Sequence, residues 1–352
     1  MRRLLVLGSF VAVLALAAGC GGGKGAAPRI SGGGATFVDP IMQKWSGEYK
    51  SAKNVEIDYV AKGSGYGMTT LTAKNIDFGC SDAPMNTKEL DAAKAAGGEV
   101  IHIPVAIGAV AVMYNLEGVK DLKLSGEVLA DIYLRKITKW NDPKIAALNP
   151  GTALPGNPIT PTARQGSSGT TAIFTEYLSK RSSEFAKSPG TSKDPKWAEG
   201  VEKKPESSGL TEFVKNTPNT IGYVEIAFAK ANGVACATMI NKAGKSVAPD
   251  AASVTAAVDE AMKVKQDKAP YSLHPLSYSF TDAAGDGSYP IVGASYAMLF
   301  KKQPKDKGPV LVEFLKWAVS DGQKSAAELH YAPLPAELTK KAQELLGTVT
   351  FE

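Results

Sequence analysis

Strand-like patterns recur along the whole chain. Residues 55–60 alternate apolar and polar side chains, which is typical of a half-buried strand. A longer apolar run covers residues 100–114, but Pro104 and Gly108 interrupt it, so it predicts one strand that continues into a second rather than a helix. Shorter apolar runs predict further buried strands at residues 76–79, 222–227 and 290–300.

Helical patterns lie between these strands. In residues 125–134, Ser125 stands as a candidate N-cap before a set of apolar positions, and residues 309–319 place their apolar side chains on one face. Asn86 is followed three residues later by Glu89, which is the spacing of a capping box. Because strands and helices alternate throughout, the sequence predicts an α/β fold.

The first twenty residues have the organisation of an export signal. Two arginines precede an apolar run at residues 4–18, which is too short for a permanent membrane anchor, and small residues follow it up to Cys20, as in a bacterial lipobox. We therefore expect residues 1–19 to be a signal peptide, Cys20 to be lipidated, and residues 20–29 to form a flexible tether. The alternative is an ordinary signal peptide that is cleaved nearby.

Composition and charge narrow the function classes. The chain of 352 residues has 40 basic and 35 acidic side chains, and this net charge of +5 is too mild and too evenly spread to indicate a nucleic-acid partner. The three histidines lie far apart and no metal-ligand spacing occurs, so we expect no metal and no cofactor. Besides Cys20, the cysteines are Cys80 and Cys236, which either pair in an oxidising compartment or remain buried thiols.

Three glycine-rich segments share one design. Residues 32–37, 63–67 and 164–170 each combine small residues with a serine or threonine, and each precedes apolar positions at helical spacing. The first N–H groups of a helix lack intrahelical partners and carry partial positive charge, and glycine lets an anion approach them. Any one segment alone is explained by helix capping and chain turns. Three of them, one beginning with Arg164, favour an oxyanion site.

A carboxylate in the segment 77–84 suggests which anion is bound. Phosphate keeps at least one proton at neutral pH, whereas sulfate keeps none, so an ionised Asp82 would accept a hydrogen bond from phosphate and would face a bare oxygen of sulfate. A site that requires one hydrogen bond can reject an analogue that lacks it by a factor of about 10⁴–10⁵. The alternative is that Asp82 caps a helix or forms a salt bridge, with Pro84 marking a turn.

Several short blocks carry a family resemblance, in order, from about residue 30 to the C-terminal 331–335. The sequence resembles the PstS family, the phosphate-binding proteins of bacterial high-affinity phosphate ABC importers. The blocks that carry the resemblance are residues 34–37, 63–65, 77–84, 131–134, 139–142, 168–170 and 222–225.

The resemblance implies a set of ligand-binding residues and no catalytic ones. Those residues would be Thr36, Phe37, Ser64, Asp82, Arg164, Ser168, Gly169 and Thr170. Two positions depart from the family pattern. Gly166 stands where related proteins often have an acidic partner of the arginine, and Cys80 stands where alanine is common.

The resemblance also implies the architecture and the partners. It predicts a type II periplasmic-binding-protein fold, in which two α/β lobes are joined by two hinge strands and the ligand lies in the cleft. Lobe I would combine residues 30–103 and 281–352, and lobe II would hold residues 104–280. The expected partners are inorganic phosphate, the permease subunits of an ABC importer, and a membrane through the N-terminal lipid, with the protein itself a monomer.

Three other function classes remain open from the residues alone. A hydrolase is disfavoured because no histidine lies near a serine-rich segment and no Gly-x-Ser-x-Gly elbow occurs. A second class is a binding protein for another oxyanion, such as sulfate, molybdate or a phosphonate, and Asp82 argues against sulfate and molybdate. A lipid-anchored phosphate scavenger or sensor without a transporter remains an alternative, because the surface that would contact a permease has no recognisable motif.

Overall fold

The computed structural model describes residues 27–352. The predicted signal peptide and Cys20 lie outside these residues. Within them, no helix combines the length and the apolar character that crossing a bilayer requires.

A mixed nine-stranded sheet forms the centre of the fold. The strand order is β2 (Glu56–Ala61), β1 (Arg29–Gly34), β3 (Phe78–Ser81), β12 (Val292–Phe300), β4 (Val100–Asn115), β8 (Thr220–Glu225), β6 (Thr160–Arg164) and β7 (Glu202–Lys204). β9 (Ala235–Cys236) is attached beside β4. β12 and β8 run antiparallel to β4, whereas β1 pairs in parallel with both β2 and β3, and β6 pairs in parallel with β7 and β8.

β4 connects the two halves of this sheet. Its first part pairs with β12 and its last part, from Val110 to Asn115, pairs with β8. The sequence predicted two successive strands here, and the structure has one strand of 16 residues. Pro104 pairs with Tyr296 directly beside a register shift that leaves Val105 without a partner in β12, and such bulges are where a strand tolerates proline.

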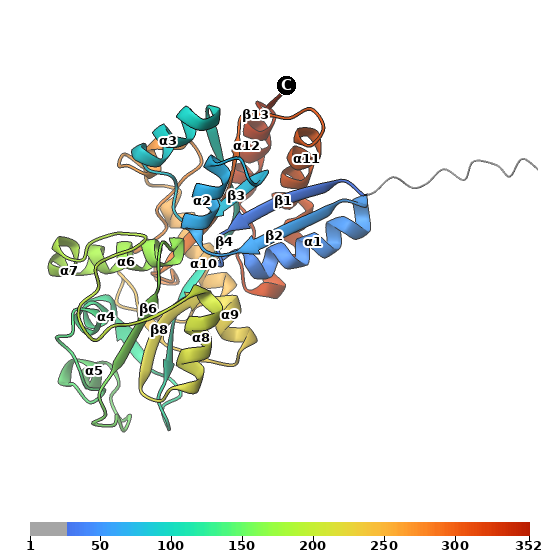
Figure 1. Cartoon of the computed structure of the whole chain (residues 1–352). Coiled ribbons are helices and arrows are strands. Elements are labelled where there is room, and N and C mark those ends of the chain that lie inside the picture. The colour runs from blue at the N-terminus through green and yellow to red at the C-terminus, as the bar shows by residue number, and fades with distance from the viewer. Residues whose placement is uncertain (1–26) are drawn as a thin grey trace, which may run out of the picture.

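Helices cover the sheet in two groups, one on either side of β4 (Figure 1). The group beside β1, β2 and β3 consists of α1 (Asp39–Lys53), α2 (Ser64–Thr72), α3 (Thr87–Gly97), α11 (Gly308–Ala318) and α12 (Ala336–Leu346). The group beside β6 and β8 consists of α4 (Gly126–Tyr133), α5 (Pro143–Leu148), α6 (Gly169–Arg181), α7 (Ser183–Lys187), α8 (Glu206–Asn216) and α9 (Ile226–Ala231), and α10 (Ala251–Ala261) lies near the middle.

Small elements complete the described residues. A second sheet contains β5 (Lys123–Ser125), β10 (Thr238–Ile240) and β11 (Ser246–Val247), and a third pairs β13 (Lys302–Gln303) with β14 (Thr350–Phe351). Short 3₁₀ helices lie at Tyr271–Leu273, Asp321–Ser325 and Ala327–Leu329.

Most of the predicted elements are confirmed. Asn86 and Glu89 form the predicted capping box of α3, and Ser125 caps α4. The strand predicted at 76–79 lies two residues further along, and just before it Asp77 accepts hydrogen bonds from the backbone and hydroxyl of Ser31, both at 2.7 Å. The α/β class is therefore correct.

The two cysteines of the described residues are free thiols. Cys80 is buried in β3 and Cys236 is half-buried in β9. Burial raises the pKa of Cys236 to about 11, so this thiol stays protonated at neutral pH.

Candidate functional site

The loop between β1 and α1 provides the first part of the site. β1 ends at Gly34, whose φ of +136° and close approach to Cys80, 2.1 Å from a Cβ added at Gly34, exclude a side chain. The next residues, Thr36 and Phe37, are buried, and the Tyr331 hydroxyl donates to the Phe37 carbonyl oxygen at 2.6 Å. This contact fixes the loop so that the Thr36 hydroxyl points inward.

The start of α2 provides the second part. Gly63 has a φ of +90°, and the chain turns there into a helix that begins with Ser64. The buried Ser64 hydroxyl accepts hydrogen bonds from the backbone N–H of Asp82, at 3.3 Å, and from that of Gly169, at 3.0 Å. One hydroxyl therefore links segments that are 18 and 105 residues away in the sequence.

Asp82 follows β3 and is the acidic group of the site. The Thr170 hydroxyl donates to its Oδ2 at 3.2 Å, while Oδ1 is buried without a hydrogen-bond partner in the described residues. Burial raises the pKa of Asp82 to about 7, and Ser295, Thr170 and the charge of Arg164 only partly oppose this. The Ser295 hydroxyl is near enough to the carboxylate to lower its pKa, but neither Ser295 Oγ nor Asp82 Oδ1 has a hydrogen-bond partner in the described residues. Such an orphaned acceptor is what a ligand that brings a proton would satisfy.

Arg164 ends β6 and is the basic group. Its side chain is only 3% exposed, and its Nη1 donates to Thr36 Oγ1 at 2.9 Å and to Ser207 Oγ at 3.0 Å. Within residues 27–352 it forms no ion pair, and its Nε is buried without a partner. Burial lowers the pKa of Arg164, but a guanidinium stays charged at neutral pH. A buried cation without a carboxylate partner is costly, and it indicates a site for an anion.

The start of α6 provides the last part. Ser168 is the N-cap of this helix, and its hydroxyl accepts from the backbone N–H of Thr171 at 3.2 Å. Gly169 packs directly against Ser64 and Asp82, and Thr170 is buried beside them. The first turn of α6 therefore faces the carboxylate and the start of α2.

The four segments predicted from the sequence meet in one place. Contacts between their side chains or backbone join Thr36 to Arg164, Ser64 to Gly169, and Asp82 to Thr170. That these groups hold a ligand stays a prediction, but the geometric condition for it, convergence on a single cluster, is met.

Sequence reasoning missed one buried side chain in this cluster. Ser207, at the beginning of α8, is hydrogen-bonded to both Arg164 and Thr36. The signal for it was weak but present, because Ser207-Ser208-Gly209 is another run of small residues at the start of a helix.

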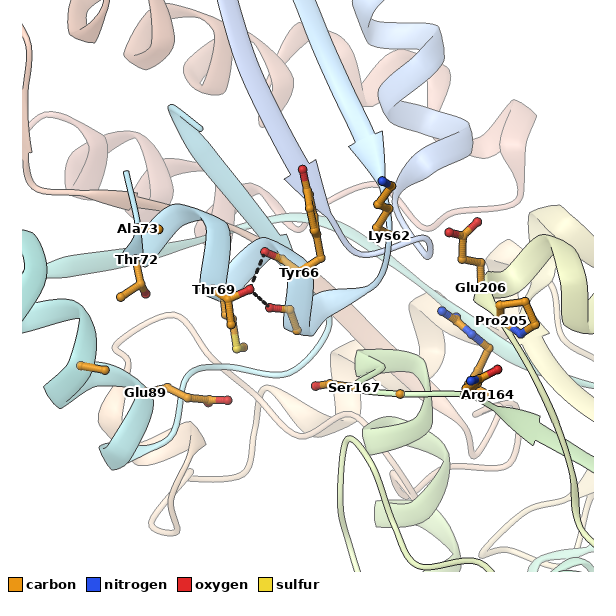
Figure 2. A pocket seen from close by; sticks show the side chains of 15 residues that line it. Lys62, Tyr66, Thr69, Thr72, Ala73, Glu89, Arg164, Ser167, Pro205 and Glu206 are labelled. Carbon is orange, nitrogen blue, oxygen red and sulfur yellow. Dashed lines mark hydrogen bonds between the residues drawn. The ribbon is translucent and has the colours of Figure 1, made fainter. Parts of the chain in front are cut away.

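A groove of about 810 Å³ borders the cluster at Arg164 (Figure 2). One wall comes from Lys62, just after β2, and from α2 and α3, with Tyr66 and Glu89. The other comes from Arg164, Ser167 and Glu206. Gly65 N–H donates to the Ser167 carbonyl oxygen at 3.1 Å between these walls. The cluster therefore lies between two groups of elements that contact each other across the groove.

Two histidines that lie far apart in the sequence support the Asp82 segment. The rings of His102 and His274 are 3.8 Å apart between centroids, and both are buried. His102 Nε2 accepts from the Met85 backbone N–H at 3.2 Å, and His274 Nε2 lies 2.8 Å from the Met85 carbonyl oxygen. Burial lowers the pKa of His102, so it is neutral here.

No group of three side chains suited to a metal ion occurs among residues 27–352.

The fold and the site define a binding protein of the PBP superfamily, whose domain profile matches residues 22–322. Relatives named phosphate-binding protein PstS include one from Pasteurella multocida strain Pm70, 40% identical over 320 residues that cover 90% of this chain and 89% of that protein. Another, from Xylella fastidiosa strain Temecula1, is 39% identical over 319 residues that cover 90% of this chain and 84% of that protein. The chain therefore belongs to the PstS family.

Solved structures agree on the fold. A high-affinity periplasmic phosphate-binding protein, solved with phosphate, superimposes with a TM-score of 0.74 at 19% identity, covering 90% of this chain and 93% of that one. A putative phosphate ABC transporter substrate-binding protein from Clostridium perfringens gives a TM-score of 0.64 at 17% identity, covering 87% of this chain and all of that one. The predicted periplasmic-binding-protein fold is confirmed.

Proposed function

We propose that this protein captures inorganic phosphate outside the cytoplasm and delivers it to an ABC importer. The observation that carries the proposal is the pairing, in one buried cluster, of a cation without a carboxylate partner and a carboxylate with an orphaned oxygen. An anion that keeps a proton is complementary to both: it accepts from Arg164 and donates to Asp82. Phosphate has this property at neutral pH and sulfate lacks it.

The binding residues that we propose are the eight predicted from the sequence. Thr36, Ser64, Ser168 and Thr170 offer hydroxyl groups, and Phe37 offers a backbone N–H near a helix start, where anions are favoured. The Gly169 N–H, which donates to Ser64 in the described structure, would turn to the bound anion. Asp82 and Arg164 supply the acceptor and the charge. No nucleophile with an adjacent base is part of the proposal, so we expect binding without turnover.

We further propose that binding closes a cleft between two lobes. The division of residues 30–103 plus 281–352 from 104–280 is supported by β4, which pairs with β12 by its first part and with β8 by its last part. The proposed ligand residues come from both sides of this division and would favour the closed state by contacting it preferentially. Acylation of Cys20, with residues 20–29 as a tether, would hold the monomeric protein near the permease subunits.

Calorimetric titration of ligand-stripped protein with phosphate and then with sulfate tests the function. We expect tight phosphate binding and no measurable sulfate binding at the same concentrations. Small-angle scattering should show a smaller radius of gyration with phosphate, and p-nitrophenyl phosphate should stay intact. Tight binding of sulfate would favour the wider oxyanion class, and hydrolysis would favour an enzyme.

Gly169→Ala should weaken phosphate binding about a hundredfold. A Cβ at this position would lie 2.5 Å from Ser64 Oγ and 2.6 Å from the Asp82 backbone nitrogen, so α6 and the Asp82 segment must separate. A displacement of about 1 Å in a preorganised enzyme site can cost two orders of magnitude in rate, and we expect a comparable loss of affinity here. Gly47→Ala is the matched control, because a Cβ there meets nothing within 4 Å. Equal phosphate affinities of the two variants would contradict the proposed role of this contact.

A further inference from the structure

Ser207 completes a closed triangle of hydrogen bonds with Thr36 and Arg164. Ser207 Oγ lies 2.7 Å from Thr36 Oγ1 and 3.0 Å from Arg164 Nη1, and Thr36 Oγ1 lies 2.9 Å from the same nitrogen. All three side chains are buried, Ser207 completely. The hydroxyl groups of Ser207 and Thr36 therefore restrain each other, and both restrain the guanidinium of Arg164.

This triangle differs from the usual environment of a buried arginine. Buried guanidinium groups are normally paired with a carboxylate, which orients the charge and also cancels it. In this chain residue 166 is Gly166, with a φ of +74° and open space around its Cβ direction, so the family's acidic position offers no partner. Among residues 27–352, Asp82 and Glu206 act on Arg164 electrostatically but form no ion pair with it.

The backbone conformation at the start of α8 places Ser207 beside Thr36 and Arg164. Glu206, its first residue, has a left-handed φ of 52°, which costs a non-glycine residue free energy and is seldom adopted. Pro205 and Glu206 lie beside Arg164 at the edge of the groove (Figure 2). The next residue, Ser207, is thereby turned inward, while Ser208 is exposed.

We propose that Ser207 is a positioning residue that fixes Arg164 and Thr36 for the anion without neutralising the arginine. The inference rests on the proposed function of the site. Because hydroxyl groups carry no charge, the bound anion receives the full charge of Arg164. Ser207 should therefore act equally on phosphate and sulfate, and Asp82 alone should distinguish the two.

Titration of the Ser207→Ala variant with inorganic phosphate tests this role. We expect affinity to fall about thirtyfold, because the variant loses a hydrogen bond to a charged group and frees the guanidinium to move. Ser207→Thr keeps a hydroxyl and should restore affinity to within about threefold. Ser208→Ala, one residue away on the surface, should bind as the wild type does.

Two further readouts separate positioning from a general structural role. The loss in Ser207→Ala should have the same factor at low and high ionic strength, since no charge is removed, and residual sulfate binding measured at millimolar concentrations should weaken by the same factor. Wild-type affinity in folded Ser207→Ala would overturn the inference while leaving the proposed function intact. A wild-type protein that does not bind phosphate would overturn the proposed function instead.

Discussion

Replacement of Arg164 with glutamine should weaken phosphate binding about a thousandfold. Arg164 is buried, forms no ion pair within residues 27–352, and points its Nη1 at the centre of the cluster between Thr36 and Ser207. Removing one partner of a buried, hydrogen-bonded charge pair costs roughly 2–5 kcal/mol, and about 4 kcal/mol corresponds to a factor of a thousand. Isothermal titration calorimetry with phosphate measures the change directly.

The same substitution should stabilise the ligand-free protein, which separates lost binding from lost folding. The buried guanidinium pays a desolvation cost that no carboxylate offsets, so its removal should raise the free energy of unfolding by about 1–2 kcal/mol. Arg164→Lys keeps the charge but not the planar fork of donors, so its affinity for phosphate should lie between those of the wild type and Arg164→Gln. Phosphate binding within about threefold of wild type in Arg164→Gln would show that the anion lies elsewhere.

Replacement of Asp82 with asparagine should remove most of the preference for phosphate over sulfate. On the proposed binding mode, the wild-type carboxylate accepts a hydrogen bond from the phosphate hydroxyl and would face an acceptor oxygen of sulfate, a mismatch worth a factor of about 10⁴–10⁵. Asparagine can turn an N–H donor towards the anion, so sulfate should gain affinity and the ratio should fall by at least about a hundredfold. Competitive titrations with both anions on one preparation give this ratio.

The stability of the Asp82→Asn variant provides its own control through pH. Burial raises the pKa of Asp82 to about 7 from an ordinary value near 3.9, so the folded protein binds more protons than the unfolded chain between about pH 4 and pH 7. Wild-type stability contributed by this group therefore falls as pH rises through that window. Without phosphate, the free energy of unfolding of the variant, measured with urea, should exceed that of the wild type by about 2 kcal/mol at pH 8 and should equal it near pH 3.5.

Two results would contradict the predictions for Asp82→Asn. An unchanged phosphate-to-sulfate ratio in Asp82→Asn would refute the role of the carboxylate as a proton detector. A stability difference that is equal at pH 3.5 and pH 8 would show that Asp82 is ionised without cost in the folded protein.

On this proposal, groups that bind the anion lower the stability of the ligand-free protein. An arginine without a carboxylate, an Asp82 oxygen without a donor and a left-handed Glu206 all cost free energy in the ligand-free protein. An anion that keeps a proton would relieve the first two at once. Binding should therefore raise the melting temperature through linkage as well as close the cleft.

Local chemistry explains why many elements could be predicted from the sequence. A capping box such as that of Asn86 and Glu89 satisfies donors within one turn, and Ser125 caps α4 in the same way. Strand limits depend on partners instead. β4 runs without a break past Pro104, beside a register shift in its pairing with β12 that the sequence of β4 alone does not reveal.

The same distinction between local chemistry and tertiary contacts applies to the candidate site. The sequence by itself determined the donor groups, since glycine, serine and threonine before a helix expose N–H and hydroxyl groups whatever surrounds them. Only the tertiary structure decided the place of Ser207, which lies 43 residues from Arg164 and 171 from Thr36. It also decided the pKa of Asp82, because desolvation depends on what the rest of the chain packs around a carboxylate.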